Sequence, residues 1–401
     1  MPAGVEGFVP SRLKMAREAR AMRQGELASL IDRVPPTISK WENEDQSQRP
    51  EPAVLPRLAD ALQVETSWFF KPLEQEHSAS FFRSLVGELE LMRAKARARL
   101  GFVEAIEEAI SNHIELPDVD IPDLMEGHDF LSLRKEDIEF AANSLRDHWD
   151  IGDGPIDDLL LVIENAGIVV AEDQIGSPKL DGLSRWSFLK ERPYMLLAQD
   201  KRVGVRRRLD AAHELAHIVL HKAVNQKDLQ ENFKLIEEQA MMFAGAFLLP
   251  AEAYEDDIYS LSLDAMLSVK SKWKVSVAAQ IKRLANLDKF SHDYERRLWQ
   301  YYSYRKWRSR EPLDDVLEIE KPQNLKDSIE MMLGDNIVTR DELVRDIGIS
   351  RADIVSLTGI AGAYFEPAPD NLVRMRPKIR EASDSNQTNS AEIFTLGGRR
   401  R

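Results

Sequence analysis

The sequence predicts a multidomain, mainly α-helical protein with an α+β centre. Most segments combine helix-forming residues with apolar residues at helical spacing, whereas only the short apolar runs 167–171 and 194–198 have the character of strands. Helix-breaking stretches divide the 401 residues, a length that suits two to four domains. We expect five successive parts: 1–72, 73–150, 151–300, 301–366 and 367–401.

Composition limits the chemistry that this chain can carry. Its hydrophobic content of 43% and charged content of 30% are those of an ordinary globular protein. There is no cysteine, which excludes disulfides, a thiol nucleophile and cysteine-ligated zinc or iron–sulfur sites. Any transition metal must therefore be held by histidine and carboxylate side chains. The formal net charge of −14 argues against a nonspecific nucleic-acid coat but leaves room for a local basic face.

Neither a membrane span nor an export signal is expected. No apolar run reaches the roughly 18 residues that a membrane helix needs. Residues 1–8 lack a basic segment followed by an apolar core. These observations predict a cytoplasmic protein with no membrane partner.

The N-terminal part, 1–72, is expected to be an all-α domain. Its four short helices are predicted at 11–22, 24–31, 35–42 and 52–62. Proline opens the third of them, where its missing N–H costs little. A three-residue turn joins the second and third helices, and the third carries small polar residues. This arrangement matches the helix-turn-helix geometry that fills a major groove.

The motif residues of this part resemble the Cro/repressor-like (XRE) helix-turn-helix family over about residues 10–70. They are Gln24-x-Glu26-Leu27-Ala28 and Ile38-Ser39-Lys40-Trp41-Glu42. The resemblance implies that Thr37, Ser39 and Lys40 face base edges or phosphates, with Gln24 and Arg33 on the DNA backbone. The implied partner is a double-stranded DNA operator, and a homodimer would suit its two-fold symmetry. Asp32 and Glu44 depart from the family, which commonly has glycine at these positions.

Charge along this part is divided. Residues 10–40 carry seven basic side chains against three acidic ones, whereas the acidic residues that follow would repel phosphate: Glu42, Glu44, Asp45 and Glu51. The alternative to DNA binding is a small helical domain that binds a protein or anchors a dimer.

Residues 73–150 are predicted to be a helical linker, with helices at 82–114 and 135–149 around the proline-containing connector 116–122. The Gly- and Pro-containing stretch 152–155 marks the next boundary. Beyond it we expect a mixture of a small sheet and helices. The expected elements are helix 156–166, the two strands, long helices 205–222 and 230–248, and two helices within 262–285.

The strongest functional signal is the run His213-Glu214-Leu215-Ala216-His217. Residues four apart lie on one face of a helix, so His213 and His217 can offer two imidazoles to one Zn²⁺. Glu214 lies where it can activate a water molecule and pass the proton to a leaving amine, but it is not placed as a ligand. We therefore predict a zinc-dependent hydrolytic site. The alternative is that both histidines are ordinary helical residues.

A zinc site needs a third protein ligand, and three residues qualify. Glu237 lies on the next predicted helix, 20 residues after His217, which suits a helix–loop–helix return. Glu238 is the second choice on that helix. His221 lies one more turn along the first helix, but three consecutive turns converge on one ion with difficulty. His221 could instead support a ligand or line the pocket.

Three blocks of this part resemble the ImmA/IrrE family of metallo-endopeptidases and cover about residues 155–290. They are the runs 208–221, 236–250 and 269–279. The resemblance implies a thermolysin-like zinc site with Glu237 as the third ligand. Two positions depart from the family. Ala216 stands where glycine is usual, and Met241 stands where Asn or Asp often lies and could orient a ligating histidine.

Peptide hydrolysis also requires a group that stabilises the developing oxyanion. Tyr194 and Arg208 are the candidates in the sequence. The alternative for each is structural, namely a packed tyrosine and an arginine at the start of a helix.

Residues 301–366 are expected to form a small helical domain. Thr339 and Glu342 form a predicted capping box ahead of a helix, a glycine turn and a second helix. This part could be a second helix-turn-helix or a protein-interaction module, although a plain helical subdomain is the simpler interpretation. The tail 367–401 is rich in Pro, Asp, Ser, Asn and Arg and is predicted to be disordered.

Two hypotheses of function follow. The first is a DNA-binding transcriptional regulator whose zinc endopeptidase cleaves a repressor or other regulatory protein in a stress or mobile-element response. The second is a DNA-binding, antitoxin-like repressor whose peptidase fold is a sensor with weak or no turnover. Bound zinc with an intact Glu214 favours the first. Operator binding that is unaffected by Glu214→Gln favours the second.

Overall fold

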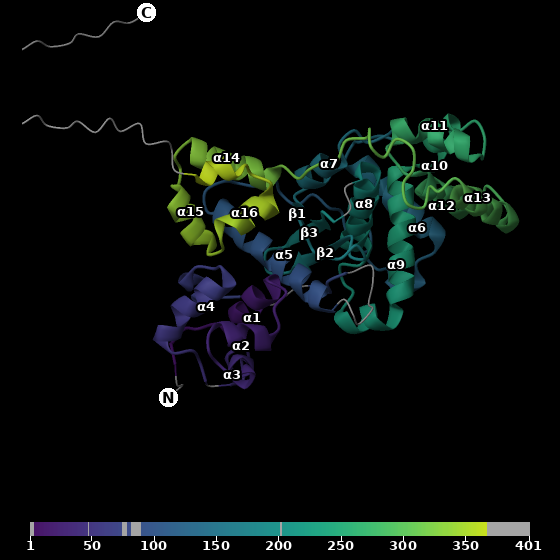
Figure 1. Ribbon diagram of the computed structural model, residues 1–401. Coiled ribbons are helices and arrows are strands. Elements are labelled where there is room, and N and C mark those ends of the chain that lie inside the picture. Colours follow the sequence, from purple (N-terminus) through teal and green to yellow (C-terminus); the bar gives the residue numbers. More distant parts are fainter. Residues whose placement is uncertain (1–3, 47, 74–77, 82–89, 201–202, 367–401) are drawn as a thin grey trace, which may run out of the picture. The chain divides into compact units, whose positions relative to one another are not determined.

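The computed structural model describes residues 4–46, 48–73, 78–81, 90–200 and 203–366 (Figure 1). These residues form sixteen α-helices and one three-stranded sheet, so the expectation of a mainly α protein with a small sheet is confirmed. The predicted disordered tail, 367–401, lies outside the described residues. Within them, no helix has the length and apolar character needed to span a membrane.

The N-terminal helices match the predicted helix-turn-helix arrangement. They are α1 (Pro10–Ala19), α2 (Gln24–Leu30), α3 (Pro35–Trp41) and α4 (Leu55–Leu62). Asp32, in the turn between α2 and α3, has φ 52°, in the left-handed region that favours glycine. This conformation explains why glycine is common at the position where Asp32 departs from the family. Leu13, Ile38 and Trp41 are buried and join the helices.

Helix α5 (Glu90–Ser111) is the centre of one hydrophobic core. It packs against α1 on one side and against α14 (Asn324–Gly334) and α15 (Arg340–Ile347) on another (Figure 1). The helix predicted at 82–114 is therefore found over 90–111, and residues 82–89 lie outside the described part. Helix α6 (Lys135–His148) is also found as predicted.

The sheet has the order β1-β3-β2, with β1 (Val169–Asp173) parallel and β2 (Gly182–Ser187) antiparallel to β3 (Arg192–Ala198). Strand β2 was not predicted, because its sequence GLSRWS has no apolar run. Side chains on β3 alternate between two cores: Tyr194 faces the α5 core, and Met195 faces the core that contains α8. Strand β2 forms one edge of the sheet.

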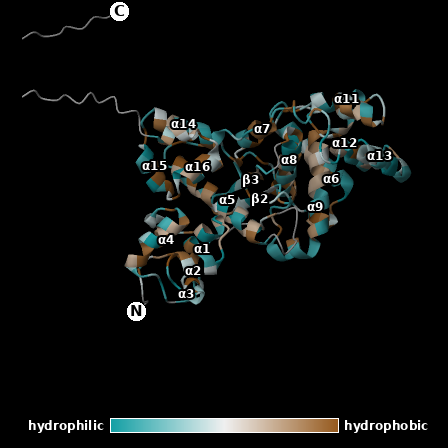
Figure 2. Cartoon of the chain, viewed as in Figure 1, coloured by the Kyte–Doolittle hydropathy of each residue, from teal (hydrophilic) through white to brown (hydrophobic). Residues whose placement is uncertain are grey.

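The second core joins the other sheet face to α7 (Leu159–Asn165), α8 (Gly204–Leu220) and α9 (Gln226–Leu248). Helix α9 bends at Asn232, where the backbone leaves helical geometry. Helices α10 (Ala251–Asp257), α11 (Leu263–Trp273), α12 (Val277–Asn286) and α13 (His292–Tyr304) complete this half. Of these four, α10 and α13 were not anticipated. Figure 2 shows hydrophobic and hydrophilic residues interleaved along these helices, as in amphipathic helices.

The C-terminal helices share the α5 core with the helix-turn-helix domain. The predicted capping box of Thr339 and Glu342 starts α15, and Gly348 ends it with φ 84°. Helix α16 (Arg351–Thr358) follows, and its Asp353 is buried against Arg20 of the N-terminal domain and Arg99 of α5. The first turn of α16 thus contacts the N-terminal domain and α5 through Asp353. The boundaries of a separate C-terminal domain at 301–366 remain a prediction.

Candidate metal centre and helix-turn-helix

Two consecutive helices bring a His–His–Glu cluster together. His213 and His217 lie one turn apart on α8, and their Nε2 atoms are 3.1 Å apart. Glu237, on α9, faces both nitrogens with its carboxylate. Its Oε2 lies 3.4 Å from His213 Nε2, and its Oε1 lies 3.4 Å from His217 Nε2. One ligand atom from each residue lies within 4.8 Å of the others. The predicted helix–loop–helix return therefore brings Glu237 to the two imidazoles, whereas Glu238 is exposed and lies outside this cluster.

The donor set fits a zinc ion. Both imidazoles are buried, and Glu237 Oε1 is buried without a hydrogen-bond partner among the described residues. Two neutral imidazole nitrogens and a carboxylate oxygen at this separation form the three-ligand set of a catalytic zinc site, which keeps one position for water or substrate. Although burial opposes it, the neighbouring His213 and His217 side chains lower the pKa of Glu237 to about 2. The carboxylate is therefore ionised, as a ligand must be.

His221 supports His217 instead of joining the cluster. Its Nδ1 lies 3.0 Å from Nδ1 of His217, and its Nε2 lies 3.0 Å from Oε1 of Gln239. The amide nitrogen of Gln239 donates to the carbonyl of Phe130 (2.6 Å), so Oε1 must be the atom that accepts from His221. Burial lowers the pKa of His221 to about 3, which keeps the ring neutral.

The contacts from His217 through His221 to Gln239 form a hydrogen-bond relay. The direction of its hydrogen bonds decides which ring nitrogen of His217 keeps a lone pair for a metal ion. A neutral His221 that donates through Nε2 has a bare Nδ1, which accepts the Nδ1–H of His217. The lone pair of His217 Nε2 then points toward Glu237 and His213. Sequence reasoning gave no role to Gln239, because nothing in the local pattern distinguishes it from any other helical glutamine.

Glu214 is held from the sheet side. Its Oε2 accepts a hydrogen bond from Ser184 Oγ (2.7 Å) on β2, and burial raises its pKa well above the usual value. A Cβ at Gly182, also on β2, would meet Glu214 Oε1 at 3.2 Å, so the glycine leaves room for the carboxyl group. Both residues were missed together with the strand that carries them.

The structure brings neither proposed oxyanion group to the cluster. The Tyr194 hydroxyl donates to Glu107 of α5 (3.0 Å), on the sheet face turned away from α8. Arg208 pairs with Glu320 and donates to the carbonyl of Ile156 (2.7 Å). Strand alternation explains the placement of Tyr194, and the salt bridge with Glu320 explains that of Arg208.

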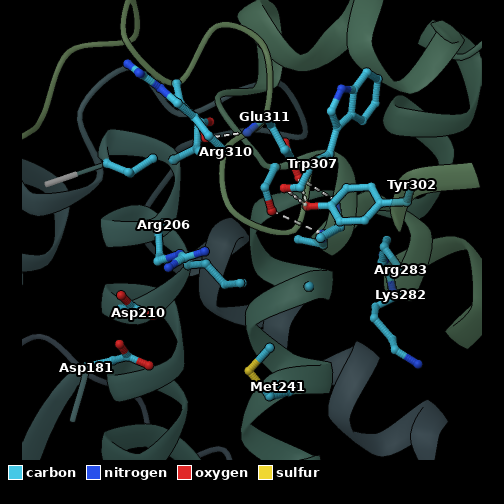
Figure 3. Close-up of a pocket in the computed structure, with 18 of the residues that line it drawn as sticks. Asp181, Arg206, Asp210, Met241, Lys282, Arg283, Tyr302, Trp307, Arg310 and Glu311 are labelled. Atoms are coloured by element: carbon cyan, nitrogen blue, oxygen red, sulfur yellow. Dashed lines mark hydrogen bonds between the residues drawn. The ribbon is translucent and has the colours of Figure 1, made fainter. Parts of the chain in front are cut away.

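A cavity of about 400 Å³ lies between α8, α9, α12 and α13 (Figure 3), and its lining includes none of the three cluster residues. Asp210 and Met241 line it, and each lies within about one helical turn of a cluster residue. Across the cavity lie Tyr302 and Lys282 (Figure 3). Met241 thus presents a thioether where a polar side chain would be expected, and His213 Nδ1 is buried without a hydrogen-bond partner among the described residues.

Buried polar contacts fix the third helix of the N-terminal domain. Glu42, at the end of α3, accepts two hydrogen bonds from the buried Arg17 (2.6 and 2.8 Å) and one from Gln24 (2.8 Å). These bonds tie α1, α2 and α3 together. Ser39 and Lys40 are exposed on α3, as is Arg33 in the turn, whereas Thr37 is half-buried. The amide nitrogen of Gln24 is used inside the domain.

Fold and site define a class of protein: a helix-turn-helix domain fused to a domain whose paired helices hold a buried His–His–Glu cluster beside a small sheet. Comparison with family models agrees. Residues 13–69 match the helix-turn-helix family, and residues 163–285 match the peptidase M78 family, described as the IrrE N-terminal-like domain. The two matches support an XRE-type helix-turn-helix part followed by an ImmA/IrrE-type peptidase-family part. No curated protein was found to match the chain.

Proposed function

We propose that the protein is a DNA-binding transcriptional regulator whose central domain is a zinc-dependent endopeptidase that cleaves a regulatory protein. The observation that carries this proposal is the convergence of His213, His217 and Glu237 within 4.8 Å. Glu214 follows His213 on the same helix, and a hydrogen bond from Ser184 holds its carboxyl group in position. A repressor-like substrate and a stress or mobile-element response are the parts of the proposal that rest on the family resemblance.

The side chains divide the work of hydrolysis. When bound, zinc supplies Lewis acidity toward the attacking water and the substrate carbonyl. Glu214 accepts a proton from the attacking water and delivers it to the leaving amine. Ser184 orients Glu214 from β2, and the relay through His221 keeps the Nε2 lone pair of His217 available.

A second candidate function is a DNA-binding repressor whose peptidase fold senses a ligand without turnover. The observation in its favour is that His213 Nδ1 is buried with no hydrogen-bond partner in the described part of the chain, while Met241 stands where the family often has a polar side chain. A ligand histidine without an orienting partner binds metal more weakly.

The DNA-binding role rests on the exposed surface of α3 and the turn before it. Ser39, Lys40 and Arg33 are available to a double-stranded operator, and the Arg17–Glu42 pair holds α3 in place behind them. Each cation placed on a phosphate releases counterions, so binding should weaken with salt. A homodimer on a two-fold operator would present two such helices.

The deciding experiment compares zinc content and turnover. Elemental analysis should find about one zinc per wild-type chain and far less in Glu237→Ala. A proteome-derived peptide library should then be cut by the wild type and left intact by Glu214→Gln. Zinc binding and operator binding without any Glu214-dependent cut would identify the sensor. Absence of zinc from carefully loaded wild type would exclude the peptidase and leave a DNA-binding regulator.

A further inference from the structure

The four described linker residues Ser78–Phe81 run along the free edge of β2. Ser78 N–H donates to the carbonyl of Trp186 (3.0 Å), and Trp186 N–H donates to Ser78 Oγ (2.9 Å). Phe81 N–H lies 3.4 Å from the carbonyl of Ser184. Because the chain advances from Ser78 to Phe81 while its partners go back from Trp186 to Ser184, the segment is antiparallel to β2.

This edge borders the candidate metal centre. Ser184, whose carbonyl receives the Phe81 N–H, also donates its hydroxyl to Glu214. The Phe81 ring stacks on the His217 imidazole, with 4.5 Å between ring centroids and 7° between the ring planes. The segment therefore contacts one proposed ligand, His217, and the residue that orients the proposed base, Ser184.

Apolar contacts anchor the segment at this position. Phe81 is 1% exposed, and Ala79 is buried with it in a small cluster that includes Val224, Leu229 and Ile236. Val224 also accepts a backbone hydrogen bond from Ala79 (3.4 Å). Side-chain anchors at alternate positions, combined with main-chain bonds to a sheet edge, are the way in which extended peptides are bound by strand addition.

We propose that the linker Ser78–Phe81 is bound as a substrate of the chain's own peptidase site and that the chain is hydrolysed at a peptide bond within this segment. This inference rests on the proposed function and names its substrate. Water adds across one peptide bond: the C–N bond breaks, a C–O bond forms to the water oxygen, and the proton taken by Glu214 passes to the leaving amine. No reactant other than water is needed.

The cut would fall between the helix-turn-helix domain and the rest of the protein, since the matched helix-turn-helix residues end at 69 and α5 begins at Glu90. Afterwards the DNA-binding domain would be held only by noncovalent contacts, among them the Arg20–Asp353 pair and the packing of α1 on α5. Hydrolysis would thus convert a permanent tether into a contact that can dissociate.

The test uses the full chain, purified in chelator and then supplied with Zn²⁺. Denaturing mass spectrometry over time should find two fragments whose masses sum to that of the chain plus one water, with the new ends within Ser78–Phe81. Glu214→Gln should yield none. Ser78→Pro, which removes the donor to Trp186, should slow the cut about two- to tenfold, and Ser80→Ala should not.

The same samples are incubated with the proteome-derived peptide library, which separates the two proposals. Glu214-dependent cuts in the library but none in the linker would overturn self-cleavage and leave the proposed function standing. If Ser78→Pro then cut the library faster than wild type, the segment would be an inhibitor. No cut in either would overturn both proposals. A linker cut that persists in Glu214→Gln would show another protease and overturn the inference.

Discussion

The relay behind His217 makes a sharp prediction for Gln239→Leu. Leucine has nearly the volume of glutamine but cannot accept the Nε2–H of His221, and it leaves the Phe130 carbonyl without its donor. His221 is then no longer constrained to present a bare Nδ1, so His217 can place its proton on Nε2, the nitrogen that faces Glu237. Metal binding would have to reverse that tautomer.

Loss of a partner that orients a metal ligand typically lowers metal affinity by about 10- to 100-fold, equivalent to about 1.4–2.7 kcal/mol. Unfolding should also become easier by about 1–3 kcal/mol, because Gln239 is 2% exposed and its loss leaves buried polar groups unpaired. Gln230→Leu is the matched control, since Gln230 is exposed on the same helix.

The assay is competition for Zn²⁺ against a chromophoric chelator, accompanied by nitrogen-15 NMR of the imidazoles in metal-free protein. Wild type and Gln230→Leu should show His217 protonated on Nδ1, and Gln239→Leu should show a mixture of tautomers. If Gln239→Leu binds zinc as tightly as the control and keeps the Nδ1–H tautomer, the relay does not orient His217.

Three further predictions concern the metal ligands, the domain junction and DNA. Glu237→Ala should abolish stoichiometric zinc binding while Glu238→Ala retains it, because only Glu237 reaches the imidazoles; equal zinc content by elemental analysis in the two variants would contradict this ligand set. Asp353→Ala should lower the free energy of unfolding in urea by about 3–5 kcal/mol, because the buried cation of Arg99 and the half-buried cation of Arg20 lose their shared carboxylate. Although burial opposes it, these cations lower the pKa of Asp353 from 3.8 to about 2, so its stabilisation is complete above pH 4 and is lost as the pH falls toward 2. The stability difference between wild type and Asp353→Ala should shrink over that range, and a constant difference would refute the assignment. Lys40→Ala should weaken operator binding similarly across sequences and reduce the salt slope by about one, as measured by titration at several salt concentrations; an unchanged slope would remove Lys40 from the phosphate contacts.

Local sequence determined much of this protein. The four N-terminal helices and the turn at 32–34 follow from short-range signals such as proline at the first turn of α3, and the helical spacing of His213 and His217 places both imidazoles on one face. The sequence also predicted that the turn of α9 carrying Glu237 and Glu238 faces α8, because the length of the return loop limits which turn can do so, and the structure then brings Glu237 to the imidazoles. These signals survive folding because neighbouring residues in the chain produce them.

Only the tertiary structure decided the surroundings of the cluster. Strand β2 has no apolar alternation, so Ser184 and its bond to Glu214 were invisible, and Tyr194 turned out to face Glu107 because strand alternation points it to the opposite core. The relay from Gln239 and the placement of the linker Ser78–Phe81 on the edge of β2 depend on contacts between residues far apart in sequence. Such contacts leave no periodic trace in the chain, since each is fixed by how separate helices and strands pack and not by the spacing of residues within one of them.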